Sequence, residues 1–238
     1  MHQSPFDPIE RSSEIENIVM RNSSRRYYRF RHSGHYGGIV TADAVGCNLL
    51  CAYCWNYQRN QLPGSYGSYY TPEKVAEKLL KISSKKGISL FRISGAEPVL
   101  GRRSMEHLVE IVKLIDSRFV LETNGLILGH MPELADMLRG LDISVRVAVK
   151  GWDERSFERI TGALGKAFWY QLTAVSELSR REVDVWPAVM YDIFGKEGLE
   201  QIENLLREIG VSKVEREDLE RYPFVMNNLR KRGIALQS

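Results

Sequence analysis

The residues of this chain best suited to chemistry are its three cysteines, Cys47, Cys51 and Cys54, which lie on one short stretch, GCNLLCAYCWN. A loop this short places three thiolates around one metal centre and offers no fourth. Structural zinc normally takes four protein ligands, whereas a [4Fe–4S] cluster held by three cysteines leaves one iron open for a substrate. The spacing favours such a cluster. Zinc bound by the three cysteines and a distant histidine is the alternative, and the five histidines are His2, His32, His35, His107 and His130.

The pattern CxxxCxxC, with Tyr53 directly before its last cysteine, resembles the signature of the radical S-adenosylmethionine superfamily. The resemblance implies that Cys47, Cys51 and Cys54 ligate one [4Fe–4S] cluster and that S-adenosylmethionine binds its open iron. Reduction of the cluster then cleaves the cofactor to methionine and a 5′-deoxyadenosyl radical, which abstracts hydrogen from a substrate. The cofactors carry out the bond breaking, while the protein supplies ligands, orientation and a dry pocket. Tyr53 is expected near the adenine, or else packs against the cluster.

A second motif, Ser94–Pro98 (SGAEP), resembles the family's GGEP segment. The resemblance implies that Glu97 and the backbone of Gly95 and Ala96 hold the amino group of the methionine end. Ala96 stands where the family usually has a second glycine. Alanine disfavours a positive φ, so we expect the local turn to differ slightly. An ordinary loop of glycine and proline is the alternative.

Two further motifs resemble segments of the compact glycyl-radical-enzyme activating enzymes, such as pyruvate formate-lyase activating enzyme. In ETNG, Glu122 and Thr123 are expected to reach ribose hydroxyls, and a plain turn is the alternative. Lys150 matches the lysine of a DLK motif, but Ala148 replaces its aspartate, which puts a monovalent cation site in doubt. The same stretch, Val147–Glu154, partly resembles a family pattern that contacts adenine. A strand followed by solvated charges is the alternative here.

The elements that must position these motifs alternate between β-rich and amphipathic segments. Expected strands cover 37–45, 88–93, 118–123, 143–149, 183–191 and about 211–216, and helices are expected between them, including 153–160, 166–181 and 197–209. This alternation predicts an α/β fold, an incomplete (βα)6 TIM-like barrel with parallel strands, and an open doubly wound sheet is the runner-up. All four motifs follow strands, so the carboxyl ends of the strands should build one site.

Length and composition predict one main core: 238 residues with 43% hydrophobic content. We expect an N-terminal basic and aromatic extension over 1–36, the radical S-adenosylmethionine partial barrel over 37–216 and a C-terminal extension over 217–238. The arginines and aromatics of 21–36 suggest either an RNA contact or, preferably, an edge strand, because the net charge is only +3. The C-terminal extension is expected to close the barrel or to meet a partner. The chain has neither a secretory signal nor a long apolar run, so we expect a cytoplasmic protein without a membrane partner.

The resemblance predicts an oxidoreductase-like radical enzyme whose substrate is unknown and whose catalytic side chains are not identified by sequence. The likeness to activating enzymes suggests a protein substrate and a low-potential electron donor of the ferredoxin or flavodoxin kind. Modification of RNA or of a small molecule is the alternative within enzymes. A non-catalytic zinc or electron-transfer module is the alternative outside them.

Overall fold

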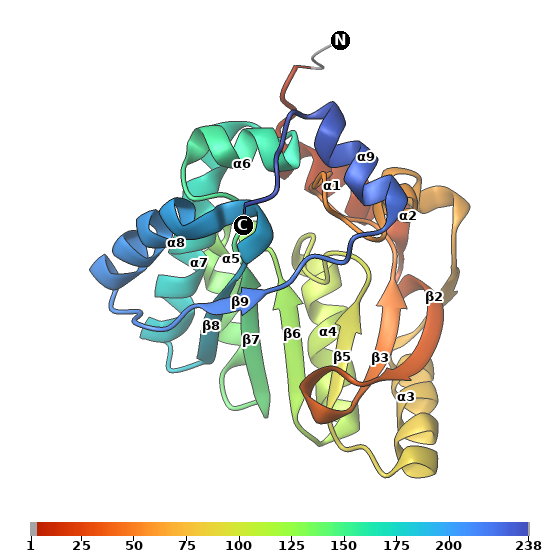
Figure 1. Cartoon of the computed structure of the whole chain (residues 1–238). Helices are drawn as coiled ribbons and strands as arrows, with labels where there is room; N and C mark the ends of the chain where they lie inside the picture. The colour runs from red at the N-terminus through yellow and green to blue at the C-terminus, as the bar shows by residue number, and fades with distance from the viewer. Residues whose placement is uncertain (1–3, 238) are drawn as a thin grey trace.

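The computed structural model describes residues 4–237, and one nine-stranded sheet forms its centre (Figure 1). Six of the strands pair in parallel, each with the next of the six along the chain. The order never reverses, which rules out the doubly wound alternative, and the path ends at an edge instead of closing. The partial barrel is therefore confirmed. In order, these strands are β3 (Ile39–Ala44), β5 (Phe91–Ser94), β6 (Phe119–Thr123), β7 (Ile143–Ala148), β8 (Asp184–Met190) and β9 (Glu215–Glu217).

The two faces of this sheet have different compositions because successive side chains of a strand point to opposite sides. On β5, Phe91 and Ile93 are buried in the main core, whereas Arg92 points to the other face. On β7, Val145 and Val147 lie in the core and Arg146 points the other way. The apolar outer face thus packs against helices, and the inner face, towards the open side of the barrel, is polar.

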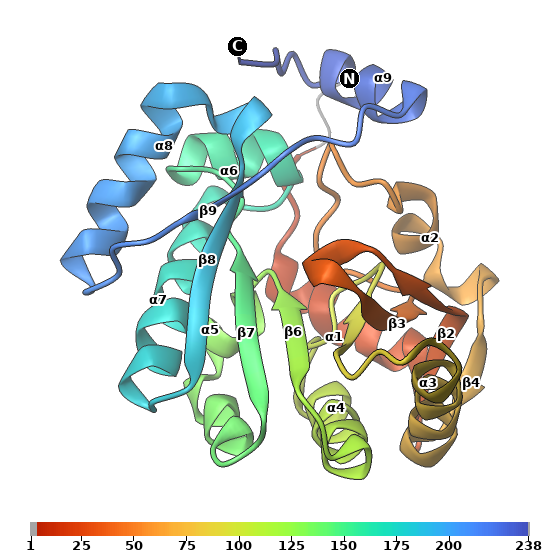
Figure 2. The same ribbon diagram turned by 60° about the horizontal axis from the view of Figure 1, so that its bottom comes forward.

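Helices cover the outer face of the sheet (Figures 1 and 2). The last of them, α8, contains a kink at Gly195 (φ 59°), which explains why its apolar periodicity predicted a start at residue 197. The segment from Pro132 to Leu138 is a 3-10 helix. These outer elements are α3 (Pro72–Lys86), α4 (Arg102–Ile115), α5 (Leu126–His130), η3 (Pro132–Leu138), η4 (Gly165–Ala167), α7 (Phe168–Arg180) and α8 (Tyr191–Glu208).

The segment before β3 extends the sheet on its antiparallel side. Helix α1 (Pro8–Val19) is followed by β1 (Met20–Arg21) and β2 (Ser24–Ser33), and β2 pairs antiparallel with β3. The strand predicted for this region is therefore present, at the antiparallel end of the sheet. Strand β4 (Ser68–Tyr70) also pairs with β2, and short 3-10 turns occur at η1 (His35–Gly37) and η2 (Pro63–Ser65).

Short helices gather at the end to which the parallel strands point (Figure 1). They are α2 (Tyr57–Gln61), α6 (Glu154–Thr161) and α9 (Pro223–Lys231). Residues 1–3 and 238, the outer ends of the two expected extensions, lie outside the described residues, and the three-part division stays a prediction. Among the described helices, none has the length and apolar character needed to cross a bilayer.

Candidate functional site

The cysteine loop leaves the end of β3 through a glycine whose conformation and neighbours disfavour any side chain. Gly46 has φ of 91°, and a Cβ there would lie 2.7 Å from the side chain of Ile15. Further on, the backbone N–H of Ala52 donates to the carbonyl of Ile160 (2.9 Å), at the end of α6. The loop is therefore fixed at both ends by the surrounding fold, which is what a rigid ligand set requires.

The C-terminal helix also holds this loop. Arg232, directly after α9, donates to the carbonyl of Leu50 (2.6 Å) in the cysteine loop and to the carbonyl of Ile160 (2.7 Å). One guanidinium thus links segments that are 182 residues apart. Part of the role of the C-terminal region is therefore to brace the cysteine loop.

Cys51 is buried, Cys47 and Cys54 are partly buried, and amide donors contact the last two. Burial raises the pKa of all three, that of Cys54 to about 11. The backbone N–H of Leu49 lies 3.4 Å from Cys47 Sγ, and Asn60 Nδ2 lies 3.7 Å from Cys54 Sγ. Burial thus disfavours the free thiolates, whereas the amides beside Cys47 and Cys54 are placed to stabilise thiolates that ligate a metal.

A cavity of about 210 Å³ brings together every site residue predicted from the sequence. Among residues 4–237, its lining contains no histidine and no fourth cysteine. Nor does any group of three His, Cys, Asp or Glu side chains in this part of the chain converge on a point that could hold a single metal ion. The structure thus shows that the predicted residues share one cavity, whereas the role of each residue stays a prediction. The ten residues are Cys47, Cys51, Tyr53, Cys54, Gly95, Ala96, Glu97, Glu122, Thr123 and Lys150.

In the SGAEP loop, the left-handed conformation falls on Gly95 (φ 81°) and not on Ala96. The alanine at the second position is therefore accommodated without strain. The carbonyl of Gly95 accepts from the side-chain amides of Asn56 (2.6 Å) and Asn60 (3.0 Å). These two asparagines, which the sequence analysis did not single out, join the loop after β5 to the cysteine loop.

Glu97 is buried and makes three hydrogen bonds within the protein. Its Oε1 accepts from Thr123 Oγ1 (2.6 Å) and the Val99 N–H (3.0 Å), and its Oε2 accepts from the Asn124 N–H (2.7 Å). Burial raises the pKa of Glu97, against the lowering effect of these hydrogen bonds and of Arg25. The carboxylate therefore ties the end of β5 to the end of β6. Its predicted contact with the methionine amino group stays a prediction.

Lys150, which is partly buried, and Tyr53, which is buried, form a pair beside the cysteines. Lys150 Nζ lies 5.1 Å from the centroid of the Tyr53 ring, within the range of a cation–π contact. Burial alone would lower the pKa of Lys150, but Tyr53, Cys51 and Glu217 outweigh it and raise the pKa. Within the described residues the Tyr53 hydroxyl has no hydrogen-bond partner. The pair thus places a fixed positive charge and an unused hydroxyl at the cavity wall.

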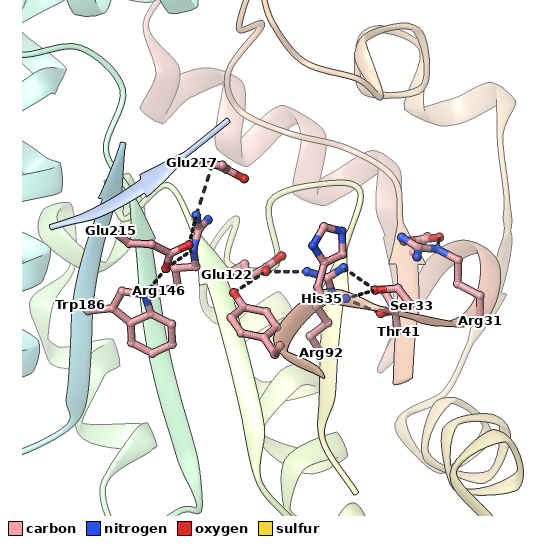
Figure 3. Close-up of polar contacts among 12 residues, drawn as sticks. Arg31, Ser33, His35, Thr41, Arg92, Glu122, Arg146, Trp186, Glu215 and Glu217 are labelled. Atoms are coloured by element: carbon pink, nitrogen blue, oxygen red, sulfur yellow. Dashed lines mark hydrogen bonds and ion pairs between the residues drawn. The ribbon is translucent and has the colours of Figure 1, made fainter. Parts of the chain in front are cut away.

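Charged residues on the inner face of the sheet continue the site, and sequence reasoning missed most of them (Figure 3). Glu122 accepts from Arg92 (2.7 Å) and from the Tyr36 hydroxyl (2.9 Å). Arg146 pairs with Glu215 (2.9 Å) and Glu217 (3.3 Å). The sequence signal that could have identified these residues is an arginine in the middle of two apolar strands, ISLFRIS and ISVRVAV.

The segment that follows β9 forms part of the wall of the cavity, and whether the C-terminal extension closes the barrel or meets a partner stays a prediction. Residues 217–220 line the cavity, and Leu219 is buried there. Asp192 holds this segment by accepting from the Leu219 N–H (2.8 Å) and from Arg221 (2.7 Å). In Figure 2 the chain from β9 to α9 runs across the end of the barrel. This segment is therefore anchored to α8.

Comparison with known families agrees with this geometry. A model described as the Radical SAM superfamily matches residues 43–209. A probable GTP 3′,8-cyclase of Thermoplasma volcanium is 32% identical over 118 residues, 49% of this chain and 33% of the relative. Another, of Methanococcus aeolicus, is 29% identical over 174 residues, 69% of this chain and 54% of the relative. The FeMo cofactor biosynthesis protein NifB of Frankia alni is 28% identical over 134 residues, which are 53% of this chain and 26% of the relative. The chain thus spans between about a quarter and about half of these curated relatives.

Solved structures with low sequence identity share the fold. Native anSMEcpe with bound AdoMet superposes with a TM-score of 0.57 at 17% identity, covering 75% of this chain and 52% of that chain. Spore photoproduct lyase complexed with dinucleoside spore photoproduct superposes with a TM-score of 0.57 at 14% identity, covering 79% and 58%. At these identities the likeness shows the shared partial barrel alone.

Proposed function

The chain belongs to the radical SAM superfamily, whose members use a [4Fe–4S] cluster and S-adenosylmethionine, and from that premise we propose that it abstracts hydrogen from a small-molecule substrate. The observation that carries the proposal is the single cavity shared by three cysteines and seven further predicted residues. The names of the relatives, a GTP cyclase and a protein of metal-cofactor biosynthesis, support a small molecule over the protein partner expected from the sequence.

The residues present fit the two cofactors. The three thiols lie on one braced loop, and the cavity lining in residues 4–237 offers no fourth ligand that would close a zinc site. Two buried polar atoms at the cysteine loop, Tyr53 OH and Asn48 Nδ2, have no protein partner among these residues. A buried polar group left without a partner is costly, and Tyr53 also lines the cavity, so its hydroxyl is placed to contact a bound group.

When bound, the cofactors supply a low-potential electron, sulfonium cleavage and a carbon radical that takes a hydrogen atom. Cys47, Cys51 and Cys54 would hold the cluster. Glu97 fixes the ends of β5 and β6 and leaves Oε2 with capacity for one more donor, such as an ammonium group. Lys150 is placed to offset a carboxylate, and residues 217–220 form part of the cavity wall.

The proposed partner for the electron is a small redox protein of the ferredoxin or flavodoxin kind. Anaerobic reconstitution with iron and sulfide tests the proposal. The loaded protein should show an iron–sulfur absorption band and, on reduction with dithionite, should release 5′-deoxyadenosine from S-adenosylmethionine. One zinc per chain without 5′-deoxyadenosine would indicate a structural metal module instead.

A fractionated cell extract separates the two kinds of substrate. The low-molecular-mass fraction should stimulate 5′-deoxyadenosine release, and the macromolecular fraction should not. Stimulation by the macromolecular fraction that is sensitive to protease would restore the activase interpretation, and sensitivity to ribonuclease would favour RNA.

A further inference from the structure

A second cavity, of about 650 Å³, adjoins the cysteine cavity. The two share lining residues, among them Trp55, Ser94 and Glu122, so they lie against the same side chains. The larger cavity is bordered by the inner face of the sheet, by β2 and by the segment after β9. It is therefore the space in which a substrate would lie beside the cofactors.

Arg29 and Arg31 form one wall of this second cavity. Arg29 lies directly opposite Asp43 in the pairing of β2 with β3, and Arg31 lies diagonally to it. A β-bulge between Tyr27 and Arg29 sets this arrangement, since bulges redirect side chains. As a result, the Nε atoms of Arg29 (2.6 Å) and Arg31 (2.7 Å) both donate to the same oxygen, Asp43 Oδ2.

The cluster of Arg29, Arg31 and Asp43 carries two positive charges and one negative charge. The Asp43 side chain is fully buried, and its single negative charge faces two guanidinium groups. The side chains of Arg29 and Arg31 stay 47% and 26% exposed. Arg29 uses one of its five N–H donors on Asp43 and Arg31 uses two, so most of their donors are free for a ligand.

The other two arginines of the cavity are different. Arg92 is 5% exposed and is matched by Glu122, and Arg146 is 6% exposed and is matched by Glu215 and Glu217. Their charges are already balanced by neighbouring carboxylates. The surplus cation of the cavity therefore lies at Arg29 and Arg31.

The opposite wall is acidic. Figure 3 shows Arg31 at one end of the row of polar residues and Glu215 and Glu217 at the other. Asp218 and Glu220 also line this side. A nucleic acid, with a charge at every phosphate, needs a continuous basic surface and would be repelled here. A small molecule with one anionic end and with hydroxyl or amine donors at the other end matches both walls.

We infer that Arg29 and Arg31, held together on Asp43, bind the phosphate or carboxylate group of the small-molecule substrate. Guanidinium groups present parallel N–H donors that match the oxygens of either anion. The inference rests on the proposed function, because it assigns the substrate class of the same site. It also places the remainder of the substrate along the inner face, towards the cysteine cavity.

Calorimetric titration of the reconstituted protein with inorganic phosphate, pyrophosphate and succinate tests this inference and separates phosphate from carboxylate. The wild type should bind at least one of them with a Kd on the order of 1 mM. Arg29→Gln and Arg31→Gln should each weaken that binding by about tenfold to a hundredfold, and Arg31→Lys should weaken it less. Single variants leave one guanidinium on Asp43, which protects the fold.

Arg180→Gln is the matched control, because Arg180 is an exposed arginine paired with one carboxylate, Glu177, on α7. Its affinity for the three anions should equal that of the wild type. Absence of saturable binding, or equal affinity in the Arg29 and Arg31 variants, would overturn the inference. Binding of bulk tRNA that depends on Arg31, without binding of the small anions, would overturn it as well.

Release of 5′-deoxyadenosine by the same wild-type preparation separates this inference from the proposed function. Release without anion binding would contradict the arginine site alone. Anion binding that depends on Arg31, in a loaded protein that releases no 5′-deoxyadenosine, would contradict the radical function alone.

Discussion

The cysteine loop and the inner face of the sheet border the same open space but are built in different ways. The loop is held by its own turn, by backbone hydrogen bonds to α6 and by Arg232. The inner face is held by ion pairs between side chains of neighbouring strands, such as Arg92 with Glu122. The loop can therefore fix a cofactor in one place, whereas the inner face presents charges that select what enters.

Burial separates the two regions further. Glu97 and the thiol of Cys51 are almost completely shielded, and their surroundings raise their pKa values. On the inner face, one partner of each ion pair keeps contact with the cavity: Glu122 is 19% exposed and Glu215 is 37% exposed. Substitutions around the loop should therefore have larger effects than substitutions on the inner face, and the following predictions test that order.

The largest effect is expected from Cys51→Ser. Removal of one thiolate leaves a cluster with too few protein ligands, so the reconstituted protein should lose its iron–sulfur absorption and its 5′-deoxyadenosine release should fall to background. Circular dichroism should show that the variant stays folded, because the loop is braced by backbone contacts. A variant that keeps both the absorption band and the release would show that Cys51 is no ligand.

A smaller effect is expected from Glu97→Gln. An amide cannot accept at both ends, so at least one of the three buried donors at Glu97 loses its partner. Urea denaturation should show a loss of about 3 kcal/mol in the free energy of unfolding. Glu110→Gln, on the exposed side of α4, is the matched control and should change it by less than about 0.5 kcal/mol. Equal stability of the two variants would remove the structural role of Glu97.

The next prediction concerns His107, which supports the strand that carries Arg29 and Arg31. Its Nε2 lies 3.0 Å from the Tyr27 hydroxyl, its Nδ1 lies 2.7 Å from the Ser23 carbonyl, and burial lowers its pKa to about 4. Because the unfolded chain takes up this proton near pH 6.5, the contribution of His107 to stability is full above that pH. It falls as the pH drops towards 4.

The free energy of unfolding should therefore fall between pH 7 and pH 4.5. His107 should account for about 2 to 3 kcal/mol of that fall. His107→Gln should remove that part of the pH dependence, while His32→Gln, at an exposed position on β2, should keep it. Urea denaturation at the two pH values measures the difference. An unchanged dependence in His107→Gln would show that the histidine titrates normally in the folded protein.

The contrast between the two regions also explains what the sequence could predict. The cysteine loop and the SGAEP motif are contiguous in sequence, and each follows a strand with a clear apolar pattern, so both the fold and the shared cavity were accessible. The role of Glu97 in tying strands was not, because its partners Thr123 and Asn124 come from the next strand. Arg146 and Glu215 are 69 residues apart, and only the register of the sheet brings them together.

Local signals were also overlooked at the N-terminus. Asp7 and Pro8 form a cap and first turn, and Asp7 Oδ1 accepts from the Ile9 N–H (2.8 Å). That dipeptide is a typical start of a helix. Helix α1 was missed because few apolar residues follow the cap, so its periodicity is weak, and its buried side comes from packing under the cysteine loop.

The smallest expected effect is the coupling between Arg92 and Glu122. A double-mutant cycle with Arg92→Met and Glu122→Gln should give a coupling free energy of about 1 to 2 kcal/mol, because Arg92 is buried and Glu122 is mostly so. The exposed pair of Lys74 and Glu77 provides the matched control, and exposed pairs couple by less than about 1 kcal/mol. Urea denaturation of the single and double variants measures both cycles. If the two couplings are equal, the inner face behaves as an ordinary solvated surface. In that case it could not hold Arg92 and Arg146 neutralised while Arg29 and Arg31 stay free for an anion.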